Sequence, residues 1–225
     1  MLTYIIMVLL PGLLLGGLAA WRVKASFKEA EQFAASSGMT GAEAARRILD
    51  SFGQHEVGVE QISGHLNDHF DPNERVLRLS ERVYHGNNLA ALGVAAHEAG
   101  HAMQQATGYF PLTLRQIFVP AASFGSSGSF FVLLAGLIFQ MQPLIWIGVG
   151  LFALVVLFQL INLPCEFDAS NRAKDHLEEL GIIHPQEKPM VSKVLGAAAM
   201  TYVAALTTSI LTLVYYLMIA TQSEG

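Results

Sequence analysis

The sequence predicts a mainly α-helical integral membrane protein, with about four transmembrane helices joined to a small α+β unit. Hydrophobic residues make up 52% of its 225 residues and charged residues only 14%, against roughly 25% charged residues in soluble domains. Asp, Glu, Lys and Arg are absent from 1–21, 116–165 and 194–223. Each of these runs is long enough for a membrane-spanning helix, which needs about 20 apolar residues.

The uncharged runs accommodate four spans, which we expect at about Leu2–Ala20, Ile117–Phe139, Leu144–Leu163 and Leu195–Ala220. The letters QMQP at 140–143 predict the turn between the middle two spans, because a proline suits the first turn of a new helix. The weakly apolar letters FGSSGS at 124–129 favour a helix face that meets other helices rather than lipid. No basic residue precedes the first apolar run, so we expect an uncleaved anchor rather than a signal peptide.

The basic residues predict the orientation of the chain. All 13 Lys and Arg side chains lie in 22–115 or 164–193, and the positive-inside rule places both segments in the cytoplasm. The predicted organisation is an N-terminal anchor (1–21), a cytoplasmic part (22–115), a transmembrane hairpin (116–163), a second cytoplasmic segment (164–193) and a C-terminal transmembrane helix with its tail (194–225). The net charge of −5, without a basic stripe, argues against nucleic acid as a partner.

The segment 22–115 has the pattern of an α+β unit. Thr40 and Glu43 form the sequence of a capping box, so a helix is expected to begin there and to end at Gly53. Short alternating runs at 55–62, 65–70 and 75–80 then predict two or three strands in a short antiparallel sheet.

Helices are expected to follow the strands. Residues 80–84 predict a short helical turn, and a long helix is expected from Asn87 or Asn88 to Ala106, ended by Thr107-Gly108. In 164–193 the pattern predicts one helix that begins near Glu166, after the third span, and ends near Leu180.

The long helix carries the letters HEAGH at 97–101. Side chains four residues apart lie on the same face of a helix, so His97 and His101 can present two imidazole nitrogens to one ion. Glu98 directly follows His97 in the sequence, so its carboxylate is expected beside the metal rather than as a ligand to it. The spacing is that of the HExxH motif, in which two histidines bind zinc and the glutamate is the general base.

A catalytic zinc ion needs a third protein ligand and one open position. Glu166 is the strongest candidate, because two membrane crossings return it to the side of the bilayer that holds the histidine pair. The residues alone leave Asp168, His85, His69 and His65 as alternatives. A donor that would stabilise an oxyanion is also expected, and the sequence offers His176, His85, Tyr84 and Arg172 without choosing among them.

The run DHFDPNERVLRLSERVYHGNNLAALGVAAHEAGHAMQ, followed by two spans and the letters EFDAS, resembles the YugP-like bacterial membrane zinc metallopeptidases. The layout is more distantly similar to the HtpX-type and CAAX prenyl proteases. The resemblance implies a zincin-like catalytic unit in which His97, His101 and Glu166 bind Zn²⁺ and Glu98 is the catalytic base. In the distant group an aspartate orients a ligand histidine. Ser170 stands at that position here, and its hydroxyl, Asp168, Asn171 or a backbone carbonyl could take the same role.

The sequence therefore predicts a zinc metalloendopeptidase of the bacterial inner membrane, with its active site facing the cytoplasm. Glu98 would accept a proton from a zinc-bound water that attacks a peptide bond. The expected partners are the lipid bilayer and a peptide or membrane-protein substrate. Two alternatives remain open: an intramembrane site-two-type protease with 86–110 as a further span, and a metal-binding membrane scaffold without catalysis. The oligomeric state is not predicted.

Overall fold

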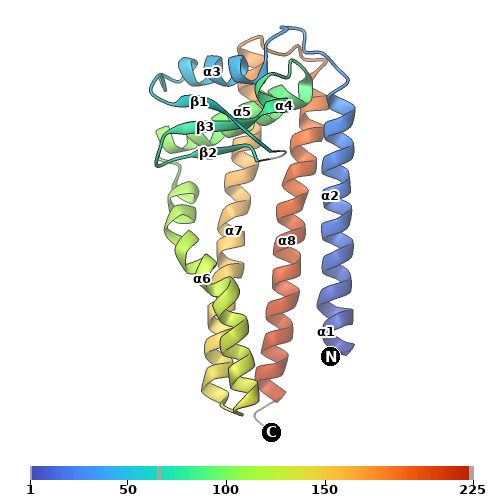
Figure 1. Ribbon diagram of the computed structural model, residues 1–225, viewed down its shortest axis with the longest axis vertical. Helices are drawn as coiled ribbons and strands as arrows, with labels where there is room; N and C mark the ends of the chain where they lie inside the picture. The colour runs from blue at the N-terminus through green and yellow to red at the C-terminus, as the bar shows by residue number, and fades with distance from the viewer. Residues whose placement is uncertain (1, 65–66, 223–225) are drawn as a thin grey trace. The chain divides into compact units, whose positions relative to one another are not determined.

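The computed structural model describes residues 2–64 and 67–222, and the chain that it shows is mainly helical (Figure 1). Four helical segments are long and apolar enough to cross a membrane: Leu2–Ala30, Phe110–Ile138, Gln142–Glu179 and Lys188–Gln222. Three of the four predicted spans lie within one of them, and the predicted span Ile117–Phe139 extends one residue beyond the end of its helix at Ile138. The helix that carries HEAGH does not belong to this set among the described residues.

The chain divides into two compact units. One comprises Met1–Ala19, Phe110–Pro164 and Thr201–Gly225, and we call it the apolar unit. The other comprises Ala20–Tyr109 and Cys165–Met200, and we call it the site unit, because it holds HEAGH and Glu166.

The apolar unit is built from parts of the long helices. The first of the four helical segments comprises α1 (Leu2–Tyr4), the π-helix η1 (Ile5–Leu9) and α2 (Leu10–Ala30). The other three segments are the helices α6 (Phe110–Ile138), α7 (Gln142–Glu179) and α8 (Lys188–Gln222). Helices α6 and α7 form the predicted hairpin, and Gln140, with φ 53°, lies in the turn between them. Gly125 and Ser129 are buried, and a Cβ on Gly125 would lie 2.7 Å from the Leu151 carbonyl oxygen of α7. One face of FGSSGS thus meets a helix, as predicted.

Helix α7 corrects one expectation, because it continues through Pro164 to Glu179 and no separate helix begins at Glu166. A proline inside a helix removes one backbone hydrogen bond and usually bends or breaks the helix. Here the residues after it bury a continuous stripe at helical spacing, comprising Cys165, Ala169, Ala173 and Leu177. Packing of that stripe offsets the lost hydrogen bond, and Glu166 therefore lies inside a long helix.

The site unit contains α3 (Gly41–Ser51), α4 (Glu81–Tyr84), α5 (Leu89–Ala106) and a three-stranded sheet. The predicted capping box begins α3: Glu43 N–H donates to Thr40 Oγ1, and Thr40 N–H donates to the Glu43 carboxylate. Helix α5 also begins as predicted, because the Asn88 side chain accepts from the Ala91 N–H. Gly108, with φ 61°, follows its end.

The sheet consists of β1 (Gly58–Ile62), β2 (His69–Asp71) and β3 (Val76–Ser80), in the order β1-β3-β2. The prediction of an all-antiparallel sheet is wrong, because β1 pairs with β3 in parallel and only β2 pairs with β3 antiparallel. Strand β3 is the most apolar of the three and is almost wholly buried. It therefore takes the centre of the sheet, with β1 on one side and β2 on the other.

The core of the site unit joins these elements. Helix α5 packs against α3, α4, β2 and β3, and Figure 1 shows the three strands beside it. The largest fully buried apolar side chains of this core come from α3, β3, α5 and the end of α7 with the loop that follows it: Ile48, Leu49, Leu77, Leu79, Leu92, Met103, Leu177, Ile182 and Ile183. This packing holds α5 and the Cys165–Glu179 part of α7 in one body, on which the candidate site is built.

Candidate metal centre

Helix α5 presents the two histidines as the sequence predicts. The rings of His97 and His101 are 4.9 Å apart between centroids and meet edge to face. Small residues surround them on α5, and Ala95, Ala96, Ala99, Gly100 and Ala102 are all buried. The absence of bulky side chains lets a second helix approach this face closely.

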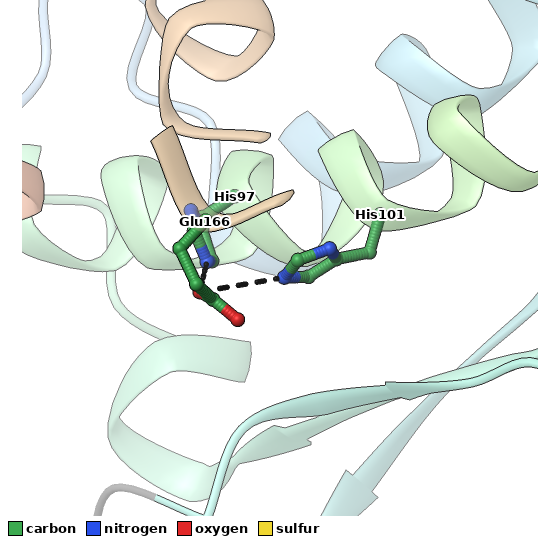
Figure 2. Close-up of side chains that lie close together, drawn as sticks. All are labelled: His97, His101 and Glu166. Atoms are coloured by element: carbon green, nitrogen blue, oxygen red, sulfur yellow. Dashed lines mark hydrogen bonds and ion pairs between the residues drawn. The ribbon is translucent and has the colours of Figure 1, made fainter. Parts of the chain in front are cut away.

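Helix α7 brings Glu166 to the same place (Figure 2). Its Oε2 atom lies 3.2 Å from His97 Nε2 and 3.7 Å from His101 Nε2. Glu166 is 2% exposed, so its carboxylate is held inside the site unit against two imidazoles. Sixty-nine positions separate Glu166 from His97 along the sequence, and the structure brings the two side chains together.

The three side chains fit the requirements of a zinc ion. One nitrogen or oxygen atom from each of them lies within 4.8 Å of the other two. Zinc bonds of about 2.0–2.2 Å in a tetrahedron place neighbouring ligand atoms roughly 3.3–3.5 Å apart, close to the 3.2 and 3.7 Å found here. A zinc ion held by two histidines and one glutamate would keep a fourth position open, as catalytic zinc sites do.

The far side of each imidazole has a polar partner. Ser170 Oγ lies 3.1 Å from His97 Nδ1, and Gln104 Oε1 lies 3.0 Å from His101 Nδ1. Hydrogen bonds at Nδ1 leave the Nε2 atoms to face Glu166 and a metal, and such partners fix the ring orientation of ligand histidines. The sequence left several candidates for the group that orients a ligand histidine. For His97 the structure favours the Ser170 hydroxyl.

Glu98 lies between the two histidines on α5 and turns toward the sheet. Its Oε2 atom accepts a hydrogen bond from the Phe70 N–H of β2, at 3.1 Å. The residue is 8% exposed. One backbone donor thus holds one carboxylate oxygen of Glu98, so the base candidate has a fixed orientation beside the histidines.

A charged turn holds β2 in place beside Glu98. The backbone N–H groups of Glu74 and Asn73 donate to Asp71, and Arg78 also pairs with it. These hydrogen bonds, with the Arg78 charge, lower the pKa of Asp71. The aspartate is therefore ionised at neutral pH, and it links the end of β2 to the turn that leads into β3.

The alternative ligands lie in other contacts. Asp168 pairs with Arg172 and accepts from Gln104, His85 contacts Gln61, and His69 contacts the Asn67 carbonyl oxygen. His65 lies outside the described residues. Within residues 2–64 and 67–222, His97, His101 and Glu166 form the one group of three metal-ligating side chains.

The predicted oxyanion donors also have other partners in the structure. His176 pairs with Glu179, His85 contacts Gln61 and stacks edge-on with Tyr84, and Arg172 pairs with Asp168. None of these contacts selects one of them for the role.

The sequence analysis missed Gln104, which is fully buried and contacts His101. A signal for it exists, because residues three apart are neighbours on a helix surface, and Gln104 is three positions after His101. A lone glutamine carries no metal-binding signature, so only its contacts identify it.

Four helices apolar enough to cross a membrane, with two histidines and a glutamate that could hold a metal ion, are the features of a membrane metalloprotein. A family model described as "Putative neutral zinc metallopeptidase" matches residues 4–221, and the chain belongs to this family. It is 46% identical over 206 residues to a protein of Bacillus subtilis (strain 168) described as "Putative membrane protease YugP", and the match covers 90% of this chain and 92% of the relative. No solved structure matches the chain. The family resemblance read from the motifs is confirmed.

Proposed function

We propose that the protein is a membrane zinc endopeptidase that hydrolyses peptide bonds at the cytoplasmic face of the bacterial cell membrane. The observation that carries this proposal is the meeting of Glu166 with His97 and His101. The buried Glu166 carboxylate faces two imidazoles, and Glu98 directly follows His97 on α5. This arrangement suits hydrolysis better than structural metal binding.

The roles of the residues follow from their positions. His97, His101 and Glu166 would hold Zn²⁺, which supplies Lewis acidity by activating a water molecule and polarising the scissile carbonyl. Glu98 accepts the proton of the attacking water and then passes it to the leaving amine. The Phe70 N–H holds one oxygen of Glu98, so we assign the proton transfer to the second oxygen.

The membrane location rests on four apolar helices and on the basic residues of 22–115 and 164–193. The positive-inside rule assigns these segments to the cytoplasm. The relative from B. subtilis is described as a membrane protease, which supports a peptide or membrane-protein segment near the bilayer as the substrate.

The test compares the parent with Glu98→Gln, both purified in detergent. The amide keeps the shape of the carboxylate but cannot accept the proton, and general-base catalysis contributes about 10²–10⁴-fold. We expect the parent to bind about one zinc ion per chain and to cleave casein. Glu98→Gln should keep the zinc and cleave at least about 100-fold more slowly. Chelation should abolish the cleavage, and added zinc should restore it.

Glu60→Gln is the matched control, because Glu60 is exposed on β1, and it should leave cleavage unchanged. Zinc in both proteins with equal cleavage by parent and Glu98→Gln would refute the proposed base. Zinc without any cleavage by the parent would favour the non-catalytic metal-binding scaffold.

A further inference from the structure

Gln104 contacts both helices of the metal centre. Its Oε1 atom lies 3.0 Å from His101 Nδ1 on α5. Its Nε2 atom donates to the Cys165 carbonyl oxygen at 2.7 Å and to Asp168 Oδ2 at 2.9 Å, both on α7. The side chain is fully buried, so one amide group lies between a ligand histidine and the backbone immediately before Glu166.

These contacts fix the orientation of the amide. The Cys165 carbonyl and the Asp168 carboxylate are acceptors only, so they must face the two N–H hydrogens of Gln104. The amide oxygen therefore faces His101 Nδ1, which can pair with it only as a donor. The His101 ring then carries its proton on Nδ1, and the lone pair of Nε2 points toward the metal position.

His97 is held less strictly. Its Nδ1 atom contacts the Ser170 hydroxyl at 3.1 Å, and a hydroxyl can either donate or accept. Ser170 therefore orients the ring of His97 without choosing its tautomer. Gln104 both orients the ring of His101 and selects its tautomer. The two histidines therefore differ in how strictly their partners fix them.

Asp168 is itself anchored. Arg172, one helical turn further along α7, donates from Nε to Asp168 Oδ2 at 2.6 Å. The Tyr109 ring lies against the guanidinium, 5.7 Å from its Cζ atom. The contacts thus run from Tyr109 through Arg172, Asp168 and Gln104 to His101.

We propose that Gln104, held by Asp168 and Arg172, is a positioning residue that fixes the His101 tautomer and sets the spacing between His101 and Glu166. The proposal rests on the proposed function for the metal centre and deepens it. Gln104 touches neither metal nor substrate in this role. It acts through the ring of His101 and through the backbone beside Glu166.

The first test measures zinc affinity by competition with a chelator. Gln104→Met keeps the length of the side chain and removes both hydrogen-bonding groups. Loss of a partner that orients a metal ligand typically costs 10–100-fold in affinity, so we expect the zinc dissociation constant to rise roughly 10- to 100-fold. The visible spectrum of the cobalt-substituted protein should also change, since the geometry of its ligands changes. Gln105→Met, at the exposed neighbouring position, should change neither property.

The second test asks whether Asp168 acts through Gln104. Asp168→Ala should weaken zinc binding in the parent, but by less than Gln104→Met. In the Gln104→Met background it should add almost nothing, because residues of one network are not additive. A general loosening of the fold would instead give two independent effects that add. Thermal unfolding of each zinc-free variant shows whether it is folded, and Gln104→Leu is the second substitution if Gln104→Met is not.

The outcomes are distinct. Parent-like zinc affinity in folded Gln104→Met, or additive effects of the two substitutions, would overturn the positioning role and leave the proposed function standing. A parent protein that binds no zinc would overturn the metal centre and the positioning role together.

Discussion

Glu166 is the one carboxylate of the candidate metal centre. It is 2% exposed and contacts both imidazoles, and loss of a buried carboxylate removes a ligand as well as the negative charge that balances a bound cation. Glu166→Ala should therefore lose stoichiometric zinc on purification, with an affinity more than about 100-fold below that of the parent. Metal analysis and chelator competition measure both quantities.

Glu179→Ala is the control, because Glu179 is the last residue of the same helix and its side chain is 66% exposed. It should bind zinc like the parent. Stoichiometric zinc with unaltered affinity in Glu166→Ala would remove Glu166 from the ligand set.

Much of the metal centre could be predicted at the residue scale. Helical spacing places His97 and His101 on one face of a helix. The two predicted crossings make Glu166 the strongest candidate for a third ligand, although the residues alone leave alternatives. The contacts of Gln104 with α7 and the choice of Ser170 could not be predicted, since they depend on the rotation of α7 about its own axis. A shift of one residue turns a helix face by about 100°, and the sequence pattern does not fix that rotation.

At the scale of elements, the close approach of α5 and α7 depends on Gly100. A Cβ added to this residue would lie 2.7 Å from the Ala169 carbonyl oxygen and 3.1 Å from its Cα. These are backbone atoms, so they cannot move aside as a flexible side chain can. Gly100 lies beside His101 and Ala169 beside Ser170, so the contact sets the distance between the two helices at the metal centre.

Gly100→Ala should therefore push α7 away from α5. Overpacking of this kind costs about 1–3 kcal/mol, which exceeds the gain of roughly 1 kcal/mol from replacing glycine by alanine inside a helix. We expect a lower melting temperature and weaker zinc binding, measured by thermal unfolding and by chelator competition.

Gly93→Ala on the same helix provides the comparison. An added Cβ there would meet only the Val191 Cγ1 atom, at 3.2 Å, and a side chain can shift by a few tenths of an ångström. This variant should be at least as stable as the parent, because it gains helix propensity. If the two variants behave alike, the contact between Gly100 and Ala169 does not set the geometry of the centre.

The elements themselves show where local pattern succeeds and where it fails. The capping box at Thr40 and the end of α5 near Gly108 are local signals, and both are confirmed. The parallel pairing of β1 with β3 is not encoded locally. Alternation of apolar and polar residues predicts a strand, but it does not predict which strand pairs with it or in which direction. The continuation of α7 through Pro164 likewise depends on the buried stripe that follows it, so a rule based on proline alone gives the wrong helix start.

At the scale of the whole molecule, charge asymmetry predicts which side of the membrane each loop occupies. The prediction can be tested by labelling with a membrane-impermeant maleimide in bacterial protoplasts. Met141, between α6 and α7, and Ser37, between α2 and α3, are both exposed. The single native cysteine, Cys165, is fully buried. Met141→Cys should be labelled in intact protoplasts, whereas Ser37→Cys should be labelled only after lysis.

The parent protein controls for reaction at Cys165 and should give little signal in either preparation. Labelling of Ser37→Cys in intact protoplasts, with protection of Met141→Cys, would reverse the orientation. The active site would then face outward, although the chemistry of the centre would be unaffected.

The long separation between His97 and Glu166 has a consequence for synthesis of the protein. A ribosome completes the histidine pair at His101, well before it adds Glu166, and the α6–α7 hairpin is made in between. A nascent chain that ends before Glu166 therefore carries only two of the three side chains of the candidate metal centre. The candidate centre can therefore be assembled only after the α6–α7 hairpin has been synthesised.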